Sequence, residues 1–122
     1  MKATVQNGAT HGLSRRDMEA LLPLLPAALS QSVKQIVLYQ GSDALLKTAF
    51  YPKEQIVGIF WPVPAESLSK VEGLKELLVA LSVIAHHGEL PKRLSPARRK
   101  QHEESTAELL EQWTRSHCSN AL

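Results

Sequence analysis

Residues 34–61 decide the fold, and they read KQIVLYQGSDALLKTAFYPKEQIVGIFW. β-Branched and aromatic side chains, which favour β-strands, gather in three runs, at 34–40, 45–51 and 55–61. Gly41-Ser42-Asp43 separates the first two runs and Pro52-Lys53-Glu54 separates the last two, and both triplets are typical of turns. Three strands joined in chain order by short connections predict an antiparallel meander.

Helices are predicted before this stretch. Ser14 and Asp17 have the spacing of a capping box, in which each side chain bonds the backbone of the other residue. Apolar residues then follow at helical spacing, but Pro23 and Pro26 remove backbone donors and interrupt the pattern. The sequence therefore predicts two short helices that end near Ser32.

Two longer helices are predicted after the strands. Between Glu66 and His87, apolar residues repeat with a period of 3.6, and the second half of the segment is apolar on all sides. A helix of that kind is usually central and buried, and Gly88 supplies its C-terminal stop. Ser95-Pro96 has the residue types of an N-cap and first position, so the last helix begins there and runs to about His117.

These elements predict an α+β domain with short N-terminal helices, a three-stranded antiparallel meander, a long central helix and a C-terminal helix. A chain of 122 residues suits one such domain. We expect a flexible tail over 1–13, a single α+β domain over 14–117 and a C-terminal tail over 118–122.

The composition excludes several classes of protein. Hydrophobic residues make up 43% of the chain and charged residues 21%, as in ordinary globular domains rather than disordered chains. The longest nearly apolar run, Leu77 to Ala85, is too short to span a membrane. Cys118 is the single cysteine, so no intrachain disulfide can form, and no apolar leader precedes Leu13. The expected location is cytoplasmic.

Basic residues are unevenly distributed although the net charge is only +2. Five of the 14 Lys and Arg residues lie between Lys92 and Lys100, at the start of the last helix, where positive charge opposes the helix dipole. Such a cluster can bind phosphate or nucleic acid. The candidate residues are Arg15, Arg16, Lys92, Arg93, Arg98, Arg99 and Lys100. The alternative is an ordinary solvated face, partly neutralised by the glutamates that follow.

The third predicted strand lacks the alternation expected of a sheet with one face in water. Its second face must be covered by the N-terminal helices or by another subunit. The interface candidates are Tyr39, Tyr51, Ile59 and Trp61. A stacking platform for single-stranded nucleic acid is an alternative, but Lys47 is the only basic residue inside the strands.

No catalytic residues are predicted, because the sequence lacks the usual nucleophile, nucleotide and metal-ligand motifs. His86, His87 and Glu89 are weak metal candidates, since paired ligands on a helix need a spacing of four residues; capping of the helix C-terminus is the alternative role of the histidines. Compact zinc peptidase-like domains share the order of helix, meander and central helix, but their HExxH motif is replaced here by the apolar stretch Leu78–Ser82.

We therefore expect a small cytosolic non-enzymatic binding or regulatory protein that acts through protein–protein contacts and self-associates. The alternative is nucleic-acid or phosphate-ligand binding through the basic residues at helix N-termini. The third hypothesis is a vestigial or metal-dependent hydrolase-like domain without HExxH. The expected partner is a protein or a second copy of the chain, with nucleic acid possible, no membrane and no cofactor.

Overall fold

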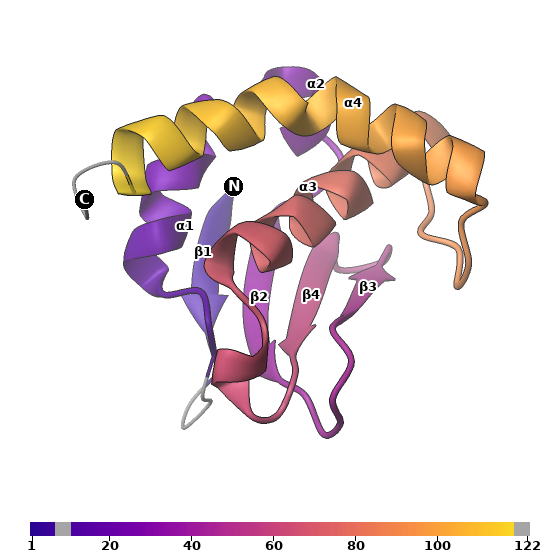
Figure 1. Ribbon diagram of the computed structural model, residues 1–122. Helices are drawn as coiled ribbons and strands as arrows, with labels where there is room; N and C mark the ends of the chain where they lie inside the picture. Colours follow the sequence, from indigo (N-terminus) through magenta and orange to yellow (C-terminus); the bar gives the residue numbers. More distant parts are fainter. Residues whose placement is uncertain (7–10, 119–122) are drawn as a thin grey trace.

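A four-stranded sheet forms one side of the molecule (Figure 1). The computed structural model describes residues 1–6 and 11–118. In chain order the strands are β1 (Lys2–Val5), β2 (Gln35–Gln40), β3 (Lys47–Tyr51) and β4 (Ile56–Trp61). Their order across the sheet is β1-β2-β4-β3. The α+β class is confirmed.

The predicted antiparallel meander is wrong, because the sheet is mixed. The hairpin between β3 and β4 forms as expected, but β2 pairs with β4 in parallel rather than with β3. The physical reason is that β4 carries apolar residues on both faces and so belongs in the interior of the sheet. The chain after β2 passes to the outer edge instead of turning back, and Gly41 allows this close passage by donating its N–H to the carbonyl of Trp61 at 2.7 Å.

The fourth strand was missed in the segment 1–13, which was expected to be a flexible tail. Lys2–Val5 forms β1, which pairs in parallel with β2. The crossover between them contains α1 (Arg15–Leu21), the 3₁₀ turn η1 (Leu22–Leu24) and the short helix α2 (Ala27–Ser30). The rest of that predicted tail includes residues 7–10, which lie outside the described residues, as do residues 119–122 of the predicted C-terminal tail.

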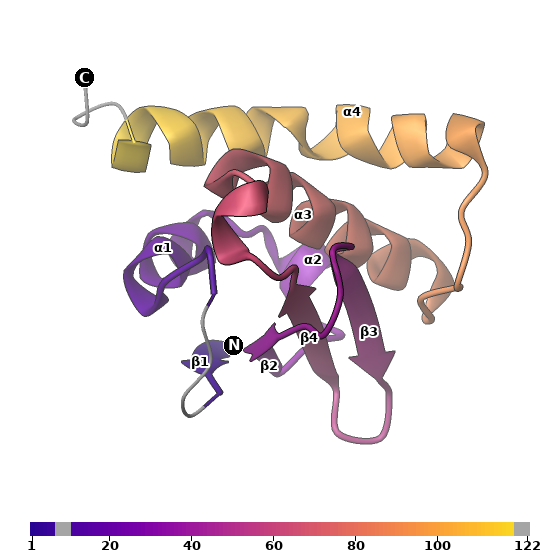
Figure 2. The same ribbon diagram turned by 60° about the horizontal axis from the view of Figure 1, so that its bottom comes forward.

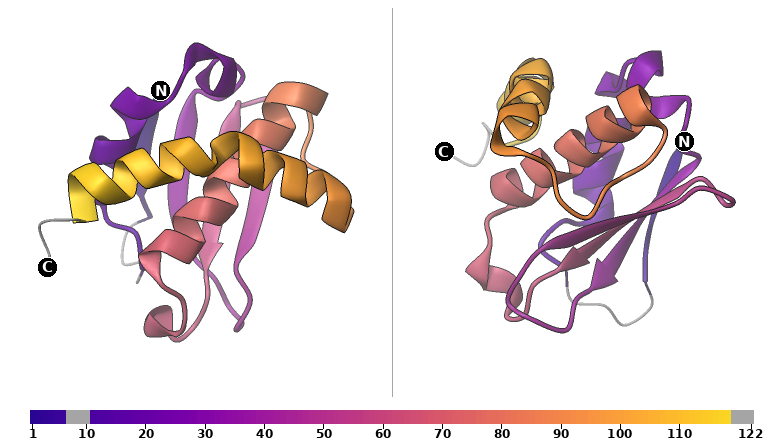
Figure 3. Two further views of the ribbon diagram at one scale, coloured as in Figure 1. Left: turned by 45° about the horizontal axis from the view of Figure 1, so that its top comes forward. Right: turned by 90° about the vertical axis from the view of Figure 1, so that its right-hand side faces the viewer.

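The helices lie on one side of the sheet, as Figures 2 and 3 show. After the 3₁₀ turn η2 (Ala65–Ser67), α3 (Lys70–His87) packs over the sheet, and α4 (Pro96–Trp113) crosses the outer side of α3. A π-helical turn, η3 (Thr114–Cys118), follows α4. α3 is central and buried, as predicted from the apolar residues on all sides of its second half.

The local helix signals are confirmed. Ser14 and Asp17 form a complete capping box at the start of α1. The Ser95 side chain caps α4 with Pro96 in its first turn. Gly88 ends α3 with φ at +71°, in the left-handed region that favours glycine.

The core lies between the sheet and α3. Ile36, Leu38, Val57 and Ile59 from the strands meet Leu74, Leu77, Leu78 and Leu81 from α3, and all eight are fully buried. Trp61 at the end of β4 and Trp113 at the end of α4 are also fully buried. Within the described ranges 1–6 and 11–118, no helix combines the length and the apolar composition that crossing a membrane requires.

Candidate functional site

One face of the sheet points away from the described helices (Figure 3). Strand register identifies its residues, because neighbours across strands point the same way. Val57, Ile59 and Trp61 point into the core, so Ile56, Gly58 and Phe60 point to the open face. Their register partners complete it: Gln35, Val37 and Tyr39 on β2, Lys47, Ala49 and Tyr51 on β3, and Lys2 and Thr4 on β1.

An aromatic pair occupies the middle of this open face. Tyr39 and Phe60 are opposite each other on the two central strands, and their rings stack with centroids 4.7 Å apart and planes 13° apart. The Tyr39 ring also lies over Gly58, where an added Cβ would be 2.9 Å from Cε2 of Tyr39. Gly58 therefore makes room for the ring, and the pair forms a ridge beside the small residue Ala49.

The charge of the open face is slightly positive. Among the strand residues on it, Lys2 and Lys47 are the only ionisable groups apart from the two tyrosines, and they lie on the two outer strands. Lys47 pairs with Asp43 in the preceding loop at 2.9 Å. The centre of the face is thus apolar and aromatic, with charge only at its edges.

The four predicted interface residues lie on two different faces of the sheet. Tyr39 and Tyr51 lie on the open face, and Tyr51 is 41% exposed. Ile59 and Trp61 do not fit the assignment, because both are fully buried on the helix side. Trp61 is part of the core. Its Nε1 donates to the carbonyl of Ala65 at 2.8 Å, and its ring packs against the His11 ring.

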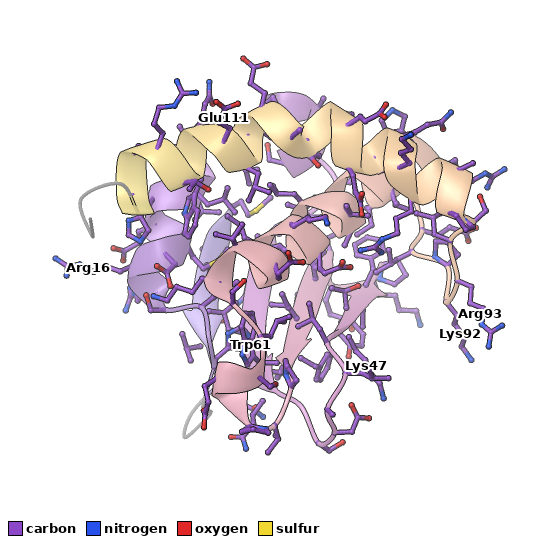
Figure 4. All side chains as sticks on the ribbon, in the orientation of Figure 1. Arg16, Lys47, Trp61, Lys92, Arg93 and Glu111 are labelled. Carbon is purple, nitrogen blue, oxygen red and sulfur yellow. The ribbon has the colours of Figure 1, made fainter. Side chains whose placement is uncertain are left out.

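The predicted basic residues do not form one surface. Arg16 on α1 and the pair Lys92 and Arg93 before α4 lie at opposite ends of the molecule (Figure 4). Arg15 pairs with Glu19 at 3.3 Å. The two basic helix starts therefore cannot contact one compact anion together.

Arg99 does not contribute a free charge to the second cluster. It pairs with Glu76 on α3 and with Glu103 one turn along α4. Of the remaining basic residues near the start of α4, Arg93 and Arg98 line one cavity, whereas Lys92 and Lys100 line two others.

Three histidines meet where the end of α3 faces α4, although only two of them are neighbours in sequence. The ring centroids of His86 and His102 are 5.3 Å apart, and those of His87 and His102 are 6.0 Å apart. In the described part of the chain, no three His, Cys, Asp or Glu side chains are placed to hold a metal ion. The weak metal candidates His86, His87 and Glu89 thus form no metal centre there.

Ser82 and His102 have the residue types of a nucleophile and its base. The Ser82 hydroxyl lies 2.8 Å from Nδ1 of His102. However, Ser82 is 1% exposed and His102 is 7% exposed, beneath α4. The two buried side chains form a polar contact between α3 and α4. Sequence reasoning missed it because residues 82 and 102 belong to different helices.

A groove lies on the opposite side of the molecule from the open face. It has a volume of about 860 Å³ between the start of α3 and the second half of α4. Val71, Ala107 and Leu110 contribute apolar lining, while Lys75, Glu104 and Arg115 contribute charges of both signs. This mixture of charge selects no particular partner.

The chain was also compared with protein-family models, with curated proteins and with solved structures, and none of the three comparisons gave a match. The functional proposal therefore depends on the arrangement of this chain's own residues.

Proposed function

We propose that this protein is a non-enzymatic binding protein that self-associates, and that the open face of its sheet is the contact surface. The observation that carries the proposal is the one-sided fold: the described helices all cover one face, while the other presents the Tyr39–Phe60 ridge. Tyr39 and Phe60 are partly buried within the chain and Tyr51 is exposed, and aromatic surface that a fold leaves uncovered is typical of protein interfaces.

A second copy of the chain is the partner that this face suits best. Its centre carries no charge, so it offers little to a strongly charged partner. Because Tyr39 and Phe60 lie on the two middle strands, a two-fold axis near the centre brings each ridge beside the other copy's ridge. The lysines of the outer strands then stay at the edge, where water can solvate them.

The size of the face sets the expected strength of association. Four strands of about five residues, at spacings of about 4.8 Å and 3.3 Å, cover roughly 300 Å² per copy. Stable specific interfaces bury about 800 Å² per partner. We therefore expect reversible association that depends on concentration, rather than a permanent dimer.

Sedimentation velocity over a concentration series tests this proposal. Tyr51→Glu places a charge on the open face and should shift the protein to monomer. Val71→Glu is the matched control, because Val71 is 36% exposed, close to the 41% of Tyr51, but lies in the groove between α3 and α4. Wild-type monomer at every concentration would overturn self-association. Dissociation by Val71→Glu instead of Tyr51→Glu would overturn the assignment to the sheet.

The nucleic-acid alternative has weaker support, because the basic helix starts lie at opposite ends. The basic residues near the start of α4 that could still bind nucleic acid are Lys92, Arg93, Arg98 and Lys100. Anisotropy of labelled single-stranded DNA tests this alternative: binding that weakens steeply with salt and is reduced by Arg98→Ala supports it, and no binding at low salt ends it. The cytoplasmic location stays a prediction of the composition.

A further inference from the structure

The contact between the end of α3 and the first half of α4 is built from imidazoles rather than apolar side chains. His86, His87 and His102 have ring centroids between 5.3 and 6.4 Å apart. His102 comes from α4 and is 7% exposed, whereas His86 and His87 form the last turn of α3. Three imidazoles from two helices therefore meet at one contact.

Hydrogen bonds fix the positions of His86 and His102 in this cluster. Nδ1 of His86 lies 2.8 Å from the carbonyl oxygen of Ser82, so that nitrogen carries the hydrogen. Nδ1 of His102 lies 2.8 Å from the Ser82 hydroxyl. The Ser105 hydroxyl donates to the carbonyl of His102 at 3.0 Å and lies 3.3 Å from the Ser82 hydroxyl. Ser82 thus joins residues of both helices.

Positive charge exceeds negative charge around His102. Burial lowers the pKa of its imidazole below 6.5, and the charges of His86, His87 and Arg98 lower the pKa further. No carboxylate within the described ranges pairs with these three imidazoles. His86 and His87 are exposed, so the unfavourable charge is that of His102: its protonation would place a buried positive charge beside Arg98.

The other charged groups around the cluster do not offset this excess. Glu89 lines a cavity of about 200 Å³ that also contains His87, but Arg93 and Arg98 line it too. Glu103, next to His102, is engaged with Lys75 and Arg99. Glu108 lines the cavity beside His86, and α2 contributes no ionisable side chain.

The first half of α4 buries no apolar side chain. The buried residues of the whole helix are His102, Thr106 and Trp113, and of these only Trp113 is apolar. Trp113 lies at the far end, fully buried, where its Nε1 donates to the carbonyl of Asp17 at 2.9 Å. One end of α4 is therefore anchored in the core, and the other is held by polar contacts and ion pairs.

We propose that the contact around His102 is a pH-operated latch: protonation of the His102 imidazole releases residues 96–106 from α3, while Trp113 keeps the far end of α4 in place. Release uncovers Ser82, the buried partner of His102 on α3. The latch closes at neutral pH and opens on mild acidification, so it gives the fold two arrangements of α4.

Amide hydrogen exchange of the full chain at pH 7.5 and pH 5.5 tests the latch. EDTA is present throughout so that no metal occupies the imidazoles. Protection factors, which correct for the intrinsic pH dependence of exchange, should fall about tenfold or more across residues 97–106. They should stay constant in β4 and around Trp113. Unchanged protection in 97–106, or an equal loss in all elements, would overturn the proposal.

A variant isolates the imidazole responsible. His102→Gln cannot be protonated, yet its amide can still bond the Ser82 hydroxyl, so the pH dependence of protection in 97–106 should disappear. His11→Gln is the matched control, because His11 is a partly buried histidine that also has a lowered pKa, caused mainly by burial, but contacts Ile59, away from α4. Persistence of the pH effect in His102→Gln contradicts the latch. If His102→Gln fails to fold, the wild-type exchange pattern alone decides.

Discussion

The side chains of Asp17 and His117, which lie 100 residues apart in sequence, meet at 2.7 Å between Oδ1 and Nε2. Asp17 is 2% exposed and also pairs with Nζ of Lys70 at 3.0 Å. The same carboxylate accepts the backbone N–H of Ser14 at 2.7 Å in the capping box of α1. One buried carboxylate thus joins the start of α1, the start of α3 and the turn after α4.

Asp17→Asn should lower the free energy of unfolding by about 2–3 kcal/mol. The amide keeps the size of the side chain but leaves Lys70 and His117 without their buried acceptor charge. Urea denaturation measures the loss. Asp43→Asn is the control, because the Asp43–Lys47 pair is exposed and solvent screening should leave it with little effect on stability. Equal effects of the two substitutions would contradict the role given to Asp17.

The lowered pKa of Asp17 also predicts that the protein loses stability in strong acid. Burial by itself raises the pKa of Asp17, but the hydrogen bonds from Ser14, His117 and Lys70 outweigh it and hold the pKa below its ordinary value of 3.8. The folded state thus favours the ionised form, and this stabilisation is present above pH 3.8 and lost as the pH falls through the folded pKa. Unfolding experiments from pH 5 downward should show a decline that is flatter in Asp17→Asn.

Gly73→Ala should destabilise the fold although alanine favours helices. A Cβ at Gly73 would overlap the ring of Trp61, which is fully buried and cannot move aside. Overpacking of this kind costs about 1–3 kcal/mol or more, and the gain in helix propensity is only about 1 kcal/mol.

Gly88→Ala provides the comparison. At Gly88 there is open space, so its cost of about 1 kcal/mol comes from the left-handed backbone alone. With Trp61 unchanged, thermal unfolding should give a lower Tm for Gly73→Ala than for Gly88→Ala. Trp61→Phe combined with Gly73→Ala should recover part of the loss if the ring overlap is its cause.

Ser82→Ala should cost about 1–3 kcal/mol, because it leaves Nδ1 of His102 without its buried partner. Ser67→Ala serves as the control: its hydroxyl donates to the carbonyl of Pro64 at the surface, so we expect a change within about 0.5 kcal/mol. A neutral Ser82→Ala would mean that water replaces the hydroxyl and that the two helices are not joined there.

The sequence was most informative where the structure depends on neighbouring residues. The capping box of Ser14 and Asp17, the N-cap at Ser95 and the stop at Gly88 obey rules that span a few positions. Strand pairing follows no such rule. The short segment Lys2–Val5 becomes a strand because α1 returns the chain beside it, and β4 reaches the interior because β3 turns back along it.

The surface residues were only partly predictable for the same reason. Tyr39 and Trp61 both looked like interface residues, but the register between β2 and β4 determines that one faces outward and the other inward. His102 could not be placed beside His86 and His87 from sequence, because the crossing of α4 over α3 brings them together. Sequence spacing describes single elements, whereas these clusters depend on how elements meet.

The closing contact of Trp113 with the carbonyl of Asp17 has a consequence for synthesis on the ribosome. α1 leaves the ribosome early, yet its buried carboxylate gains Lys70 and His117 only after most of the chain has been made. The buried carboxylate of α1 therefore lacks these two partners until both segments have been synthesised. Contacts between residues so far apart in sequence slow folding, so the site around Asp17 should be among the last parts of the fold to form.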